Sequence, residues 1–248
     1  MNWEACVEKV GPYVVKIDTP TGTGSGFLFA FNEGKKLCGI ATALHVVDDT
    51  ETWGQPLKIN NQHFQKTAHL REPERSIFKD PETDSAVILF ERSQLDLPEV
   101  LIPLRPIASP ISIGAEVGWL GFPAIAPFTL CFFSGTVSAR QDSKRYLIDG
   151  VAIRGVSGGP VFLRNEDGDI QFVGVVSAYR AAAGESLPGL LVAQDVSHFH
   201  SVLGHLKTLD EAKVKSTEAK PPSETPSSGP PDDKMTKESG SISPTPAP

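Results

Sequence analysis

The chain has little cysteine and no long apolar run, and both shortages narrow what it can be. Only three of its 248 residues are cysteines, Cys6, Cys38 and Cys131. An odd, small number without C-x-x-C spacing excludes a disulfide framework and a thiolate metal site. The longest apolar region, 122–133, is broken by two prolines and is too short to span a bilayer.

The sequence also lacks a cluster of basic residues, and its first residues do not resemble a secretory leader. Its 23 Lys and Arg stand against 30 Asp and Glu, for a formal net charge of −7. Such a balance argues against nucleic acid or an anionic membrane as the main partner. The first ten residues carry acidic side chains where a secretory signal would be basic and then apolar. We therefore expect a cytoplasmic protein, and no metal or cofactor; the oligomeric state is not indicated.

Short apolar stretches separated by turn residues are what the chain has in abundance. Its 22 glycines and 21 prolines divide it into pieces of strand length, such as Phe27 to Phe31, Leu37 to Ala43 and Ala86 to Phe90. The region 67–84 is polar and is interpreted as a long loop. Many short strands at regular spacing favour an all-β fold of paired barrels.

The C-terminal region differs from the rest. Apolar side chains recur at helical spacing in 195–206, with Asp195 as a candidate N-cap. The residues beyond it are rich in Pro, Ser, Thr, Glu and Lys, and cannot bury enough apolar surface to offset their ordering entropy. The expected organisation is one domain over 1–208, with an N-terminal barrel at about 10–92, a C-terminal barrel at about 108–194 and the helix at 195–206, then a disordered tail over 209–248.

The segment 155–160, Gly-Val-Ser-Gly-Gly-Pro, has the spacing of a serine nucleophile loop. A serine hydroxyl reacts only when a base takes its proton and N–H groups await the oxyanion. Glycines around it let the backbone turn tightly and approach a substrate closely. Ser157 is therefore the candidate nucleophile, and the N–H groups of Gly155 and Ser157 are the candidate oxyanion hole.

A histidine and an aspartate upstream complete the set. His45 follows an apolar, strand-like run, and Asp84 precedes another. Asp48 and Asp80 are alternative acids, but the apolar strand after Asp84 would bury its carboxylate beside the histidine. The order His45, Asp84, Ser157 is that of the chymotrypsin-like triad.

Seven stretches in the correct order resemble the chymotrypsin-like (trypsin-like) serine proteases, most closely the HtrA/Deg-type peptidase domain. They are 24–27 (Gly-Ser-Gly-Phe), 42–47, 84–88, 118–123, 134–138, 155–160 and 174–177. The resemblance implies two packed antiparallel six-stranded β-barrels with the triad in the cleft between them. It also implies an endopeptidase that acts on proteins or peptides through an acyl-enzyme. The residues after the helix do not resemble a PDZ domain, so we do not expect activation by peptides that bind an attached PDZ domain.

Two departures from the family matter. Val156 stands where the family has Asp or Asn, so activation by pairing that acid with a freed N-terminus is not expected. Val151 lies six residues before the serine, where trypsin-type enzymes place the acid that binds Arg or Lys. The resemblance makes Tyr179 one wall of that pocket and Gly189 the other, which suits small or medium aliphatic residues. The expected substrate-binding set is Val151, Ser177, Ala178, Tyr179 and Gly189.

Two other interpretations are open. The loop also fits the G-x-S-x-G elbow of α/β-hydrolases, with His198 or His200 as the base, although Gly-Gly-Pro opposes the helix that this fold needs after the serine. A catalytically silent protease fold that binds peptides along strand 173–179 is the second.

Overall fold

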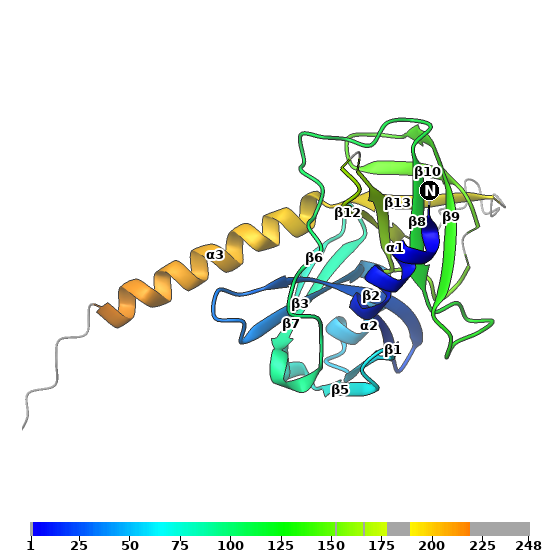
Figure 1. Ribbon diagram of the computed structural model, residues 1–248. Helices are drawn as coiled ribbons and strands as arrows, with labels where there is room; N and C mark the ends of the chain where they lie inside the picture. The colour runs from blue at the N-terminus through cyan, green and yellow to red at the C-terminus, as the bar shows by residue number, and fades with distance from the viewer. Residues whose placement is uncertain (1, 152, 166, 178–188, 219–248) are drawn as a thin grey trace, which may run out of the picture.

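The computed structural model describes residues 2–151, 153–165, 167–177 and 189–218 (Figure 1). The first half contains α1 Trp3–Val10, the 3-10 helix η1 Gly11–Tyr13, β1 Val14–Thr19, β2 Gly22–Phe31, β3 Leu37–Ala43, α2 Leu44–Thr52, β4 Leu57–Asn61, β5 Lys66–Leu70, η2 Glu72–Glu74, β6 Arg75–Asp80, β7 Ser85–Glu91 and η3 Arg92–Gln94. The second half contains β8 Glu116–Gly121, β9 Cys131–Arg140, β10 Arg145–Asp149, β11 Pro160–Arg164, β12 Ile170–Ser177, β13 Leu190–Asp195 and α3 Ser197–Glu218.

The strands form two antiparallel units. The second is a closed barrel in the order β10-β13-β12-β11-β8-β9, completed by pairing of β9 with β10. The first is a seven-stranded sheet in the order β5-β4-β1-β2-β3-β7-β6. The expected chymotrypsin-like, all-β class is confirmed, with a seven-stranded sheet in the N-terminal half where a six-stranded barrel was expected.

Two strands of the first sheet come from a region that the sequence suggested was a loop. β5 and β6 lie at the two edges of the first sheet and occupy much of 67–84. In β5, Ala68 and Leu70 are buried while His69 between them is exposed. In an edge strand with one solvent-exposed face, buried apolar residues alternate with exposed polar ones. Because half of the residues are polar, the sequence shows no continuous apolar stretch.

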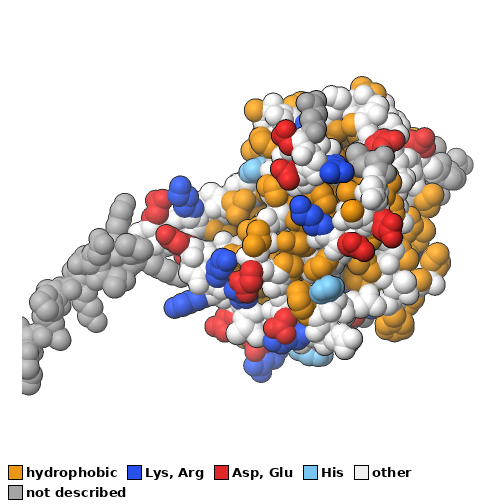
Figure 2. Space-filling model, viewed as in Figure 1, with side chains coloured by type: hydrophobic (Ala, Val, Ile, Leu, Met, Phe, Trp, Pro, Cys, Tyr) orange, Lys and Arg blue, Asp and Glu red, His pale blue; other side chains and the backbone are white. Residues whose placement is uncertain are grey.

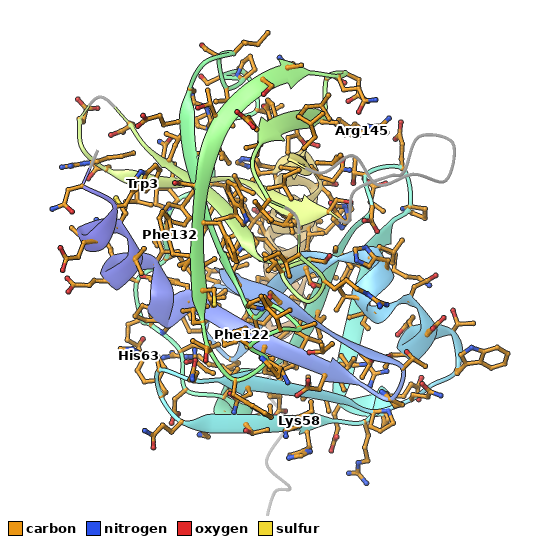
Figure 3. The ribbon with its side chains drawn as sticks, turned by 90° about the vertical axis from the view of Figure 1, so that its right-hand side faces the viewer. Trp3, Lys58, His63, Phe122, Phe132 and Arg145 are labelled. Atoms are coloured by element: carbon orange, nitrogen blue, oxygen red, sulfur yellow. The ribbon has the colours of Figure 1, made fainter. Side chains whose placement is uncertain are left out.

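Aromatic side chains join the two units. The rings of Phe27 and Phe172 lie 4.6 Å apart, and Phe199 of α3 packs on Phe29 at 5.3 Å. Trp3 of α1, a helix that the sequence analysis did not predict, lies 5.4 Å from the ring of Phe132 (Figure 3). The two units therefore share one hydrophobic core.

The C-terminal helix is longer than expected. Phe199, Val202 and Leu206 are buried against the core, but α3 continues to Glu218 and projects away from both sheets (Figure 1). It passes the boundary at 208 that composition suggested. The rest of the expected tail, 219–248, lies outside the described residues. No helix in the described ranges is long and apolar enough to cross a bilayer.

One carboxylate attaches the middle of α3 to the first sheet. Asp210 accepts hydrogen bonds from the backbone N–H of Glu33 at 2.8 Å and from Asn32 Nδ2 at 3.3 Å. We expect Asp210→Ala to lower the free energy of unfolding by about 1 kcal/mol, the usual net worth of such bonds at a partly exposed site. Urea denaturation measures this change in the free energy of unfolding. The neighbouring, exposed Glu211→Ala should change stability by less than about 0.5 kcal/mol, and equal midpoints for the two variants would contradict the attachment.

Candidate active site

His45 is placed by a sharp change from strand to helix. β3 ends at Ala43, which is extended, and α2 begins at Leu44, so His45 lies in the first helical turn. The Leu44 N–H donates to the backbone carbonyl of Asp84 at 2.9 Å. The junction between β3 and α2 is therefore held against the residue that supplies the acid.

Asp84 meets His45 with both carboxylate oxygens. Its Oδ2 lies 2.9 Å from His45 Nδ1, and its Oδ1 accepts the His45 backbone N–H at 3.0 Å. Asp84 has φ +48°, a left-handed conformation that Asp and Asn tolerate better than most residues. Ser177, in β12 of the other unit, donates its hydroxyl to Asp84 Oδ2 at 2.5 Å.

These contacts decide the charge of the carboxyl. Burial alone would raise the pKa of Asp84, but the hydrogen bonds from His45 and Ser177 outweigh it and hold that pKa below its ordinary value. Asp84 is therefore ionised at neutral pH. Because the native pKa is lowered, its contribution to stability is present above the unfolded value of about 3.9 and is lost as the pH falls through the native value.

The alternative acids and bases are engaged elsewhere. Asp48 pairs with Lys79 at 3.3 Å, and Asp80 accepts from the Thr83 hydroxyl at 2.8 Å. His198 and His200 lie on α3, with Nε2 atoms 3.4 and 2.8 Å from backbone carbonyls of other segments. β11, rather than a helix, follows the serine loop, so the α/β-hydrolase interpretation is wrong.

The serine loop packs directly against the strands that lead to His45. A Cβ on Gly158 would lie 2.1 Å from the Ser25 carbonyl and 2.2 Å from Thr42 Oγ1. A Cβ on Gly24 would lie 2.6 Å from the Val46 side chain and 3.2 Å from the Ser157 carbonyl. Gly158 needs glycine because the Ser25 backbone occupies the place of a side chain, and at Gly24 the Val46 side chain leaves no room for one. Ser157 is thereby brought beside the helix that carries His45.

The loop backbone leaves two N–H groups without a partner among the described residues. The Arg154 carbonyl accepts from Ala124 N at 2.7 Å, and the Val156 carbonyl accepts from Gly159 N at 2.9 Å. In a trans peptide the N–H points opposite to its carbonyl. The two N–H groups on these held peptides belong to Gly155 and Ser157, and neither donates a hydrogen bond within the described part of the chain.

Val156 anchors the same loop by an apolar contact. Its side chain is 1% exposed and belongs to the core of the closed barrel. No acid occupies this position, so packing takes the place of the ion pair that the resemblance would suggest. Ser157 Oγ and His45 Nε2 are not hydrogen-bonded to each other in the described structure; this bond is often long until substrate binds.

The residues predicted to bind substrate are only partly described. Val151 is 56% exposed, open to a substrate side chain. Gly189 accepts from Gly150 N at 3.0 Å, which joins the two segments predicted to border the pocket. Ser177 is 4% exposed, and its hydroxyl contacts Asp84. Ala178 and Tyr179 lie outside the described residues.

The described residues show no metal site, and the face drawn in Figure 2 shows no large field of one charge. No group of three or more His, Cys, Asp and Glu among them is placed to hold a metal ion. On the face drawn in Figure 2, basic and acidic side chains of the described residues are interspersed.

The fold and the site define a hydrolase of the serine endopeptidase class. The sequence matches the trypsin-like peptidase domain over residues 24–175, more than half of the chain. The chain belongs to that family.

Solved structures share the fold. Rv3671c from M. tuberculosis H37Rv, a serine-to-alanine mutant in its inactive form, is 21% identical with a TM-score of 0.56, over 81% of this chain and 89% of that one. The serine endoprotease from Yersinia pestis is 21% identical with a TM-score of 0.61, over 83% of this chain and 66% of that one. No curated protein matches by sequence.

Proposed function

We propose that this chain hydrolyses peptide bonds with a His45–Asp84–Ser157 triad and a covalent acyl-enzyme. His45 takes the proton of Ser157 as the hydroxyl oxygen attacks the scissile carbonyl, and returns it to the leaving amine. A water then attacks the ester, again with His45 as the base. Asp84 holds the His45 tautomer in which Nδ1 carries the proton, and stabilises the imidazolium.

The observation that carries the proposal is the 2.9 Å contact between His45 Nδ1 and Asp84 Oδ2. A carboxylate kept ionised at that position is what a histidine base requires. The N–H groups of Gly155 and Ser157, which have no partner among the described residues, support an oxyanion hole, in which each donor is worth about 3 kcal/mol in the transition state.

Labelling with a fluorophosphonate tests the triad, because the probe reacts only with an activated serine. We expect one adduct per chain, located at Ser157 by peptide mass mapping. A chain that binds peptides but gives no adduct would instead be the silent peptide-binding module, and the proposal would be wrong.

We also propose a preference for Val, Ala, Ile or Leu on the acyl side of the cleaved bond. Burying an unpaired cation beside Val151 costs several kcal/mol, so Arg or Lys there should be slower by at least about a hundredfold in kcat/KM. A peptide-library profile measures this preference. Val151→Asp should improve cleavage after Arg and Lys, while the uncharged, similarly sized Val151→Asn should not. A dominant preference of the wild-type chain for Arg or Lys would refute the pocket and leave the triad untouched.

A further inference from the structure

Ser25 lies in the N-terminal sheet, but its hydrogen bonds go to the serine loop of the other unit. The residue is 0% exposed and sits in β2, opposite Lys16 of β1. Its hydroxyl donates to the Gly155 carbonyl at 2.8 Å and accepts the Phe122 backbone N–H at 2.9 Å. One hydroxyl thus bridges three segments, with its proton and an acceptor site both used.

The backbone of Ser25 holds the same loop a second time. Its N–H donates to the Ser157 carbonyl at 2.8 Å, and its own carbonyl accepts the Thr42 hydroxyl at 2.7 Å. Thr42 belongs to β3, three residues before His45. Every polar atom of Ser25 is therefore engaged, and the bonds connect the loop of the nucleophile with the strand of the base.

The two carbonyls that accept hydrogen bonds from Ser25 flank the peptide that carries one of the proposed oxyanion donors. The Gly155 carbonyl belongs to the peptide before Val156, and the Ser157 carbonyl to the peptide after Ser157. Between them lies the peptide whose N–H is that of Ser157. The Gly155–Val156 peptide joins the peptides that carry the Gly155 and Ser157 N–H groups, so its rotation would change how those two N–H groups are oriented relative to each other. A single misplaced oxyanion donor costs about 10² to 10³ in kcat.

Val156 explains why this loop depends on such a hydroxyl. The residue before the serine is apolar and packs against Gly121, whose Cβ position lies 2.9 Å from a Val156 methyl group and 2.8 Å from Ser25 Oγ. Packing is non-directional, so it fixes where the loop sits more than which way each peptide plane faces. In Figure 3, Phe122 lies where the N-terminal sheet meets the closed barrel, at the junction that Ser25 bridges.

We propose that Ser25 is a positioning residue for the oxyanion hole, acting across the junction between the two units. The inference rests on the proposed function and adds a determinant that lies outside the triad. Ser25 touches neither the substrate nor the reacting atoms; its hydroxyl holds the Gly155–Val156 peptide, which lies between the two peptides that carry the Gly155 and Ser157 N–H groups.

The test compares Ser25→Ala with Tyr13→Phe. Tyr13 is 9% exposed, and its hydroxyl donates a hydrogen bond to the Val100 carbonyl, which the phenylalanine cannot make. For peptide hydrolysis, Ser25→Ala should lower kcat by about 100-fold, as loss of an oxyanion donor does, and leave KM within about twofold. Tyr13→Phe should leave both constants within about threefold, although both variants lose stability. The more conservative Ser25→Cys, which keeps a weak donor of similar shape, should fall between wild type and Ser25→Ala and covers the case in which the alanine variant does not fold.

Measuring peptide binding without turnover distinguishes a loss of oxyanion-hole geometry from a general disruption of the substrate-binding site. In a Ser157→Ala background, adding Ser25→Ala should leave the Kd of a substrate peptide within about twofold, because only transition-state contacts are lost. An unchanged kcat in an active, folded Ser25→Ala or Ser25→Cys chain would overturn the inference, as would a loss that appears in KM and Kd. A wild-type chain that neither hydrolyses peptides nor labels at Ser157 would overturn the proposed function and this inference together.

Discussion

Replacing Ser157 by alanine is expected to lower kcat for peptide hydrolysis by about a millionfold, the loss seen when a triad serine is removed from a serine protease. The hydroxyl oxygen is the atom that bonds to the substrate, and the hydroxyl of Ser177, the neighbouring serine of the site, is engaged with Asp84. Ser157 Oγ makes no hydrogen bond in the described structure, so stability should change by less than about 0.5 kcal/mol. Initial rates at high enzyme concentration, with thermal unfolding in parallel, measure both.

The matched control is Ser138→Ala, which removes an exposed hydroxyl from β9. That variant should keep the full rate. Retention of most of the activity by a purified Ser157→Ala protein, with contaminating protease excluded by inhibitor titration, would remove Ser157 from the mechanism.

Asp84→Asn should have the second largest effect, a fall in kcat of about ten thousandfold. An amide can still accept the His45 backbone N–H with its oxygen, the bond that Asp84 Oδ1 makes at 3.0 Å. Its NH₂ group would then face His45 Nδ1 and leave that nitrogen unprotonated. The proton would sit on Nε2, where the ring must accept one from Ser157. The base is lost although the geometry stays almost unchanged.

Asp48→Asn is the control for this prediction, since Asp48 was an alternative acid and pairs with Lys79 on the surface. We expect its kcat to stay within about threefold of the wild-type value. KM should change little in either variant, because the acid acts on the base and not on the bound substrate. A large loss in Asp48→Asn together with a small one in Asp84→Asn would reassign the acid.

The fold class and the family could be predicted because both depend on local sequence patterns. Strands with one or two buried faces produce apolar stretches that identify an all-β chain, and the glycine-rich loop around Ser157 identifies the family. The edge strands β5 and β6 were missed because half of each faces water. α1 and α2 were missed because each is short, and two turns carry too few residues for a helical period.

The sequence by itself determined the fold class, the family and the residue types available for chemistry, because each is recorded in a short run of neighbours. Only the tertiary structure decided which side chains meet. Asp84 touches His45 across 39 positions, Ser177 reaches Asp84 across 93, and Ser25 reaches Gly155 across 130. Such contacts leave no local sequence pattern, because the sequence does not distinguish a serine with a buried hydroxyl from one with a solvated hydroxyl. The packing of two sheets against each other is what removes water from these groups and leaves them one another as partners.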